Sequence, residues 1–439
     1  MRDWRYKLDP GNCPGLPAPS VPMPILDISL MQRRSRKLLR PLATAATLAA
    51  ALLVSSCGGG GEGGPGAPAF LASSSLANVC TPDGQQQFVR SLLDETYLWY
   101  DEIVPVNGTD YTTVPAYFRA LLVRTPDATG QPKDRFSVVL TSESADAQQS
   151  VVGDAALGLG VPGRALAVTS KPVPVAKVVS SPAGRKVGYI LFNDHNEGAQ
   201  DALIGAFESL RAGGVNDLVL DMRYNSGGFL YVAQAAASMV TGPQSEGKVF
   251  EQLHYSAKRQ PDTAASTLVF SSKVQTPETA YARGYPLPQL SLPRLYVLTS
   301  SQTCSASESV INSLRGIDVD VVLVGGTTCG KPYGFHRQDN CGLAFFAIEF
   351  QGYNAKNFAD YTGGIRATCA VADNTNSLLG SNDEPLLAAA LHHIDTGSCA
   401  AAAPRQSVIS QQLPGSAREH VPLMPRQPWN GRLLRQGAR

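Results

Sequence analysis

The chain has 439 residues, of which 43% are hydrophobic and 17% are charged, and its formal net charge at pH 7 is +1. This is the balance of an ordinary globular protein, and it offers no excess charge that would point to nucleic acid or to an acidic partner. The length allows two or three domains, so the organisation has to be read from the order of the elements.

The N-terminal region has the pattern of a processing signal. Residues 1–30 contain several prolines and no periodicity, and we expect them to precede the true start. Residues 31–57 begin with basic residues, continue with an apolar stretch and end in LVSSC. The apolar stretch is shorter than the roughly 20 residues of a spanning helix, and it is typical of a secretory signal. The ending resembles a bacterial lipobox, which implies acylation of Cys57; an uncleaved anchor helix is the alternative.

The segment after the lipobox favours an envelope location. Residues 58–78 are rich in glycine, and we predict a flexible tether. Gly58 and Gly59 offer no aspartate of the kind that would suggest retention at the inner membrane. We therefore expect a lipid-anchored protein of the bacterial cell envelope, at the outer membrane and facing the periplasm or the cell surface.

Cysteine usage predicts disulfides and no metal or cofactor. The eight cysteines are Cys13, Cys57, Cys80, Cys304, Cys329, Cys341, Cys369 and Cys399. They form no CxxC pair, and the chain has no HExxH motif, which argues against a zinc site. Cys13 precedes the expected start and Cys57 would carry the lipid, so six cysteines remain in an exported, oxidising compartment. Six cysteines allow fifteen pairings. We expect Cys329–Cys341 and Cys369–Cys399, because each closes a short loop; buried free thiols are the alternative.

A small helical region is predicted for residues 79–140. Apolar residues recur at helical spacing over 85–105, and the helix is expected to end before Pro105. A second helix is predicted over 114–124, and residues 134–140 have the pattern of a strand.

The core is predicted at residues 186–400, after an irregular interval at 141–185 and before a disordered tail at 401–439. Four buried strands alternate with three helices. The strands are 186–193, 217–228, 295–300 and 319–326, and the helices are 199–214, 229–240 and 301–316. This alternation predicts an α/β fold built from βαβ units with largely parallel strands. Ligands of such sheets gather where strands end and helices begin.

The stretch SQTCSASESVINSLRG, residues 301–316, crowds small residues at one of these strand-to-helix turns. A helix cap needs a single hydroxyl, so Ser305 is a candidate nucleophile as well as a candidate N-cap. Cys304 is a rival, because a thiolate is intrinsically more nucleophilic, but a disulfide would remove it.

Lys331 is the candidate base. None of the six histidines lies in a recognisable triad context, whereas Lys331 follows a buried strand and a glycine turn. A lysine base must be neutral, so its pKa must fall from about 10.4 by roughly three units, or about 4 kcal/mol. Burial without an adjacent carboxylate would have that effect. A solvated loop lysine is the alternative.

The paired glycines after the strand at 217–228 are the third element. They allow a backbone to approach a ligand closely, although most such turns are only structural. The N–H of Gly227 or Gly228, together with that of Ala306, would form an oxyanion hole.

These three segments, in this order, resemble motifs of the C-terminal processing (tail-specific) serine peptidase family, S41. The segments are LVLDMRYNSGG (218–228), SASE (305–308) and VGGTTCGK (324–331). YLWYDEIVP and DRFS resemble segments upstream of the core, and the resemblance covers roughly residues 85–395. It implies the twisted α/β fold shared with ClpP and crotonase-like proteins, Ser305 as the nucleophile and Lys331 as the base.

Two departures from the family qualify what the resemblance implies. A PDZ domain normally lies between the DRFS segment and the core, and residues 141–185 are too few for one, so we predict a remnant or a linker. Phe335 stands where many members have a glutamine that orients the lysine. Tyr333 or a backbone carbonyl would then have to orient Lys331.

The sequence thus predicts a serine endopeptidase with a Ser305–Lys331 dyad that cuts unfolded or C-terminally exposed proteins. Its partners would be a protein or peptide substrate and, through the lipid anchor, a membrane, but no nucleic acid. The alternative is a non-catalytic protein of the S41 fold that binds an apolar ligand or peptide. A structural lipoprotein left by gene decay is a weaker possibility.

Overall fold

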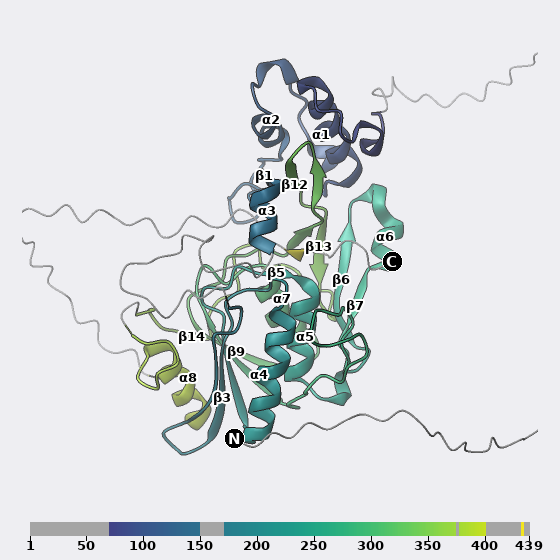
Figure 1. Cartoon of the computed structure of the whole chain (residues 1–439). Coiled ribbons are helices and arrows are strands. Elements are labelled where there is room, and N and C mark those ends of the chain that lie inside the picture. Colours follow the sequence, from purple (N-terminus) through teal and green to yellow (C-terminus); the bar gives the residue numbers. More distant parts are fainter. Residues whose placement is uncertain (1–69, 150–170, 375–376, 401–431, 434–439) are drawn as a thin grey trace, which may run out of the picture. The chain divides into compact units, whose positions relative to one another are not determined.

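The computed structural model describes residues 70–149, 171–374, 377–400 and 432–433, shown in colour in Figure 1. All of them belong to one compact unit, Gly66–Arg439. The predictions for the start of the chain, the signal and Cys57 lie outside the described residues, and so do residues 58–69 of the predicted tether. Residues 70–78 of the tether are described and contain the short helix η1 (Ser73–Leu76), whose Ser73 N–H donates to Glu95 at 2.7 Å, so the prediction of a flexible tether is wrong for them. Within the part that is described, no helix is both long enough and apolar enough to cross a membrane.

The central sheet has six strands in the order β14-β9-β8-β4-β3-β2. These are β2 (Val175–Ser180), β3 (Lys186–Leu191), β4 (Asp217–Asp221), β8 (Arg294–Thr299), β9 (Asp320–Gly325) and β14 (Cys369–Ala370). All neighbours run parallel except β2 and β3. The predicted parallel-rich α/β core is confirmed. Because its strands are parallel, the carboxyl ends of β3, β4, β8 and β9 meet at one edge.

Helices cover both faces of this sheet. They are α4 (Ala199–Gly213), α5 (Leu230–Val240) and α7 (Ala306–Gly316) in one layer and α8 (Pro385–Thr396) in another. Alternate residues of a strand point to opposite faces. Leu218 and Leu220 of β4 accordingly join the apolar cluster of α4, α5 and α7, whereas Val219 joins the cluster of α8. Burial on both faces explains why these strands appear in the sequence as unbroken apolar runs.

The N-terminal region is helical, as predicted, but its first helix is shorter than expected. Its elements are η1 (Ser73–Leu76), α1 (Pro82–Thr96), η2 (Tyr100–Glu102), η3 (Gly108–Asp110), α2 (Val114–Leu121) and β1 (Val138–Thr141). The prediction of a helix up to Pro105 is wrong, because the backbone becomes extended at Tyr97. The Tyr97 hydroxyl, fully buried, donates to Asp134 Oδ2 at 2.6 Å. This tertiary contact outweighs the local helical pattern.

The interval predicted as a PDZ remnant or linker contains two described elements, α3 (Ser142–Gln149) and β2. β2 pairs with β3 along its whole length, so the core sheet begins before residue 186. Residues 150–170 lie outside the described part.

Two further sheets flank the core. One has the order β1-β12-β11 and joins the N-terminal region to β11 (Gln338–Asn340) and β12 (Leu343–Phe346). The other has the order β5-β15-β10-β13-β6-β7. Its members are β5 (Gly228–Phe229), β6 (Val249–Tyr255), β7 (Thr267–Val269), β10 (Tyr333–Phe335), β13 (Phe350–Tyr353) and β15 (Arg432–Leu433). The remaining short helices are η4 (Pro243–Ser245), η5 (Ala257–Arg259) and α6 (Gln260–Ala265). β15 lies within the stretch predicted as a disordered tail, so that prediction is wrong for these two residues.

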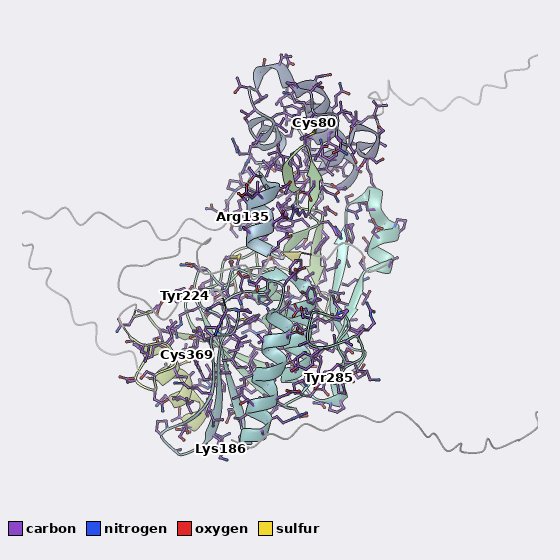
Figure 2. The ribbon with its side chains drawn as sticks, viewed as in Figure 1. Cys80, Arg135, Lys186, Tyr224, Tyr285 and Cys369 are labelled. Carbon is purple, nitrogen blue, oxygen red and sulfur yellow. A yellow bond between two sulfur atoms is a disulfide. The ribbon has the colours of Figure 1, made fainter. Side chains whose placement is uncertain are left out.

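Three disulfides connect the six cysteines of the described residues. They are Cys80–Cys341, Cys304–Cys329 and Cys369–Cys399. The expected Cys369–Cys399 bond is confirmed and Cys329–Cys341 is wrong. Loop length misled the prediction, because Cys341 lies at the β11–β12 turn beside the start of the N-terminal region, and Cys329 lies beside Cys304. Cys80, labelled in Figure 2, thereby joins two segments that are 261 residues apart.

Removing the Cys80–Cys341 bond is expected to destabilise the fold more than removing Cys369–Cys399. In the chain-entropy model a bond across 261 residues contributes about 5 kcal/mol and one across 30 residues about 3.5 kcal/mol. Urea unfolding of the Cys80→Ala/Cys341→Ala and Cys369→Ala/Cys399→Ala variants would measure the order. Equal losses, or a larger loss for the second variant, would contradict this account.

Candidate active site

Three loops meet at the carboxyl edge of the central sheet. They follow β4, β8 and β9, whose strands are direct neighbours. The first carries Gly227 and Gly228, the second Ser305, and the third Lys331. The five residues predicted for the dyad and the oxyanion hole therefore come from loops at the same edge of the sheet.

Ser305 has a strained backbone. It immediately precedes α7 with φ 58° and ψ −111°, a conformation that residues with a Cβ rarely adopt. Its side chain is fully buried and forms a capping box with Glu308 at the start of α7, in which the Glu308 carboxylate accepts the Ser305 N–H at 2.9 Å. A sharp, strained turn between a strand and a helix is the setting that presents a nucleophilic serine in hydrolases.

Gly227 packs directly on this turn. A Cβ at Gly227 would lie 2.9 Å from both the Ser305 Cβ and the Ala306 nitrogen, and the residue has φ 101°. Only glycine therefore fits here. The close approach brings the backbone of the glycine pair next to the first N–H of α7, which has no acceptor within its own helix.

The hydrogen bonds around the glycine pair favour Gly228 as the second oxyanion donor. The Gly227 N–H donates to Asn225 Oδ1 at 3.0 Å. The Gly227 carbonyl and the Phe229 N–H both bond to the backbone of His195. Because successive residues of a strand bond to opposite sides, the amide of Gly228 faces away from His195. Of the two predicted glycines, Gly228 is the better placed.

The cluster of small residues beside Ser305 connects two loops. The Thr303 hydroxyl donates to the Met222 carbonyl at 2.9 Å, and the Ser307 hydroxyl donates to the Asn225 carbonyl at 3.0 Å. The Cys304 N–H donates to the same Asn225 carbonyl at 3.1 Å. These neighbours of Ser305 hold its turn against the loop that follows β4.

Glu308 organises the nucleophile turn and the lysine loop together. Its buried carboxylate accepts the N–H groups of Ser305, Gly330 and Lys331 at 2.8–2.9 Å, and the Thr328 hydroxyl at 2.5 Å. Burial raises the pKa of Glu308, and these hydrogen bonds act in the opposite direction. The expectation that Lys331 has no carboxylate nearby is therefore wrong, since Glu308 binds its backbone.

Lys331 is fully buried and lies among aromatic rings. Its Nζ is 4.6 Å from the ring centre of Phe335 and 5.2 Å from that of Phe136. Phe335 thus contributes a ring face at the position where the family resemblance implies a glutamine in many members. Phe136 comes from the N-terminal region, which therefore contributes to the site. Tyr333 packs edge-on against Trp99 at 5.0 Å, and its role in orienting Lys331 stays a prediction.

Cys304 and Cys329 are bonded to each other immediately beside the two candidate catalytic residues. Cys304 therefore has no free thiol, and the rival nucleophile is excluded in this oxidised form. Two groups have donor atoms within 4.8 Å of one another, Cys304–Glu308–Cys329 and Cys369–His393–Cys399. In both groups the sulfurs are joined in disulfides, so they do not offer thiolates to a metal.

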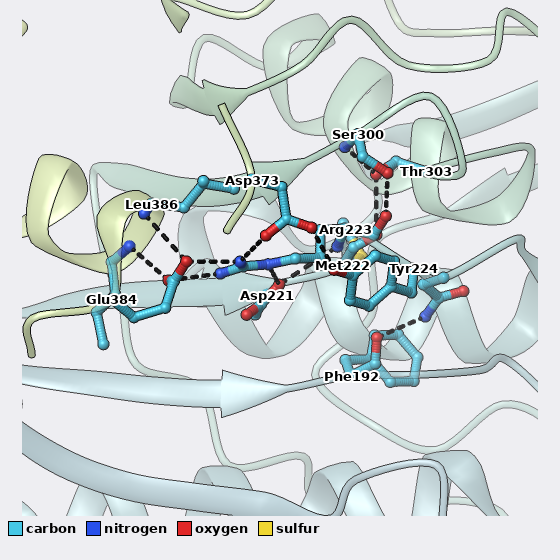
Figure 3. Close-up of polar contacts among 12 residues, drawn as sticks. Phe192, Asp221, Met222, Arg223, Tyr224, Ser300, Thr303, Asp373, Glu384 and Leu386 are labelled. Carbon is cyan, nitrogen blue, oxygen red and sulfur yellow. Dashed lines mark hydrogen bonds and ion pairs between the residues drawn. The ribbon is translucent and has the colours of Figure 1, made fainter. Parts of the chain in front are cut away.

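A buried ion-pair network supports the loop after β4, as Figure 3 shows. Arg223 is fully buried and makes two bonds of 2.7 Å to Glu384 and one of 2.9 Å to Asp221. It also pairs with Asp373 at 2.9 Å. The Arg223 carbonyl accepts a hydrogen bond from Ser300. The network thus joins the start of α8 to the base of the nucleophile loop.

His195 and Asp194 lie on the other side of the glycine pair. His195 Nδ1 is 3.0 Å from Asn225 Oδ1, which identifies Nδ1 as the donor, because that oxygen can only accept. Burial lowers the pKa of His195 to about 3 and raises the pKa of Asp194 to about 7. His195 is therefore neutral, and among the described residues no hydrogen bond links it to Ser305.

Sequence reasoning missed several residues of this site, namely Phe136, Asn225, Arg223, Glu308 and Glu384. Four of them lie inside the motifs already quoted, since Phe136 belongs to DRFS, Arg223 and Asn225 belong to DMRYNSGG, and Glu308 ends SASE. The S-x-x-E spacing of a capping box was a further signal for Glu308. Glu384 has no such signal, because its role depends on a contact with a loop 161 residues away.

The pKa values of Asp194 and His195 are shifted in opposite directions, and this predicts how the stability of the fold depends on pH. Asp194 stabilises the fold below its unfolded pKa of 3.8 and loses that contribution as pH rises through 7. His195 stabilises the fold above 6.5 and loses that contribution as pH falls toward 3. Between pH 4 and 6.5 the two slopes cancel.

The Asp194→Asn variant removes one of these slopes. As the pH is lowered from 6.5 to 4, its free energy of unfolding should fall relative to the parent by about 1.4 kcal/mol for each pH unit, because only the His195 slope remains. His195→Asn should show the opposite slope. Urea unfolding at four pH values measures both, and curves parallel to the parent would refute the assignment.

Comparison with known proteins agrees with this fold. The model of peptidase family S41 matches residues 186–353, and the model of the peptidase S41 N-terminal domain matches residues 84–138. A carboxyl-terminal-processing protease from Picosynechococcus sp. (strain ATCC 27264 / PCC 7002 / PR-6) is 28% identical over 181 residues. The match covers 40% of this chain and 38% of that protein, so the chain spans less than half of its length.

A solved structure shares the fold. An S41 protease from Bacteroides fragilis NCTC 9343 superposes with a TM-score of 0.54 and 21% identity, over 71% of this chain and 97% of that one. The photosystem II D1 C-terminal processing protease has 21% identity, a TM-score of 0.36 and coverage of 50% and 55%. The likeness to the second is too weak to support a conclusion. Both family models match in the expected order, and the chain belongs to peptidase family S41.

Proposed function

We propose that this protein is a serine endopeptidase that uses Ser305 as nucleophile and Lys331 as general base. The observation that carries the proposal is the strained turn at Ser305, packed on Gly227 and bound through Glu308 to the loop of a fully buried lysine. The substrate would be an unfolded or C-terminally exposed protein of the cell envelope, and lipidation at Cys57 would hold the enzyme at the outer membrane. The similarity to a carboxyl-terminal-processing protease from Picosynechococcus supports the preference for C-terminal regions.

The reaction would proceed through an acyl-enzyme. Neutral Lys331 takes the Ser305 hydroxyl proton while Oγ attacks the scissile carbonyl carbon. The N–H groups of Ala306 and Gly228 stabilise the oxyanion of the tetrahedral intermediate. The Lys331 ammonium then returns the proton to the departing amine as the C–N bond breaks. Lys331 finally deprotonates a water, which attacks the ester, and Ser305 is released with its proton.

A non-catalytic binding protein remains the second candidate, and the rings around Lys331 favour it. Contact with an aromatic face stabilises an ammonium by about 0.5–2 kcal/mol, which opposes the neutral form that a base requires. Full burial acts in the other direction and can exceed this effect, since desolvation moves buried lysines by several units.

The dyad is tested with the full chain and three variants, Ser305→Ala, Lys331→Ala and Ser301→Ala. Ser301 is exposed in the same loop and serves as the matched control. Mass spectrometry would follow cleavage of an unfolded protein with an apolar tail. We expect Ser301→Ala to cleave like the parent and both dyad variants to lose at least about 10³-fold in rate. Equal cleavage by all four would overturn the dyad, and no cleavage by any would support the binding protein.

The aromatic contacts are tested by the Phe335→Leu variant. Loss of the ring removes a contact that favours the ammonium, so the acidic limb of the kcat/KM profile should move to lower pH by about 0.5–1 unit. Phe350→Leu removes a similar buried ring, which packs against Tyr255 and His336, and should leave the limb in place. A limb that moves equally in both variants, or in neither, would contradict the role of Phe335.

A further inference from the structure

A piece of the chain's own C-terminal segment lies between the two sides of the candidate site. β15, residues Arg432–Leu433, is the golden strand of Figure 1. It pairs in parallel with β5 on one side, Arg432 opposite Gly228 and Leu433 opposite Phe229. On its other side it pairs in parallel with β10, Arg432 opposite Gly334 and Leu433 opposite Phe335.

The two strands that flank β15 carry the groups proposed for catalysis. β5 begins at Gly228, the candidate oxyanion donor, and its neighbour Gly227 lies against Ser305. β10 begins at Tyr333, two residues after Lys331. The sheet order places only β15 between them. β5 and β10 therefore border a position one strand wide, about 10 Å from one flanking strand to the other.

A peptide that enters this position would be bound by strand addition. Two unpaired strand edges offer main-chain donors and acceptors to an extended segment on both of its sides. Such a segment passes next to Gly228 and Ser305, as a scissile peptide must. The backbone of β15 thus occupies the place that an extended substrate would take.

We propose that Arg432–Leu433 is an intramolecular competitor that fills the substrate strand position between β5 and β10. The inference rests on the proposed function and adds its regulation and the form of its substrate, an extended peptide held through its backbone on both sides. The site is closed when β15 is paired and opens when an incoming segment displaces it.

The connection to α8 allows this pairing within one chain. The described core ends at residue 400, and 31 residues separate it from Arg432. Fully extended, that number of residues spans up to about 100 Å, far more than the size of a domain requires. A segment tethered in this way has an effective concentration on the order of 1 mM. If it binds with a Kd of about 0.1 mM, it would hold roughly ten elevenths of the molecules closed.

The pairing is tested in the full chain by two double variants. Arg432→Pro/Leu433→Pro removes both N–H donors of β15, and its kcat/KM for peptide cleavage should rise about tenfold. Arg432→Ala/Leu433→Ala keeps both donors and is the matched control, which should stay within about twofold of the parent. No rise in the proline variant, or an equal rise in both, would overturn the proposal.

A binding measurement separates this proposal from the dyad. A fluorescent peptide with the sequence of residues 426–439 would be titrated by anisotropy into chains that carry Ser305→Ala. We expect the peptide to bind the chain that also carries the proline pair with a Kd of about 0.1 mM. Its Kd for the chain with an intact tail should be at least about tenfold higher. Equal affinity for both would refute the competitor, whatever the peptidase assay shows.

The two measurements also distinguish a failure of the proposed function. Binding that depends on the proline pair, in a protein that cleaves nothing, would support the strand position and overturn the peptidase. Cleavage that depends on Ser305 but not on the proline pair would do the reverse. A kcat/KM of the parent that falls as its own concentration rises would show the tail acting between molecules and would overturn the intramolecular pairing.

Discussion

The buried carboxylate of Glu308 is the interaction on which the geometry of the site depends. It binds both the nucleophile turn and the lysine loop, through the N–H groups of Ser305, Gly330 and Lys331. Hydrogen bonds to a charged group contribute about 1.5–3 kcal/mol each, which is enough to offset much of the cost of burying the charge. The disulfide between Cys304 and Cys329 joins the same two loops covalently.

A second buried charge fixes the loop after β4 relative to the loops of Ser305 and Lys331. Arg223 is surrounded by Asp221, Glu384 and Asp373, so a cation inside the protein is matched by carboxylates from three segments. Burial raises the pKa of Asp221 even beside Arg223, because both side chains are fully buried. The main-chain carbonyls of Met222, Arg223 and Asn225 are thereby fixed, and they accept hydrogen bonds from the residues around Ser305.

The N-terminal region belongs to the site as well as to the fold. Asp134 accepts hydrogen bonds from the Tyr97 hydroxyl and from the N–H groups of Phe136 and Ser137. This arrangement directs Phe136 to Lys331, while β1 pairs with β12 and Cys80 is bonded to Cys341. A region that sequence patterns describe only as helical thus supplies one wall of the lysine pocket. The β1–β12 pairing and the Cys80–Cys341 bond hold that wall in place.

The sequence by itself determined the parallel-rich core, the strand-to-helix turns and the residue types of the site. These features are local, because buried strands are continuous apolar runs and the site motifs are short segments around Ser305, Lys331 and Gly227. Tertiary structure alone decided the end of α1 at Tyr97, the partners of Cys329 and Cys341, the ring of Phe335 over Lys331 and the pairing of β15 with β5 and β10. Each of these depends on contacts between residues far apart in the chain, and no local pattern encodes which distant segment will satisfy a given side chain or strand edge.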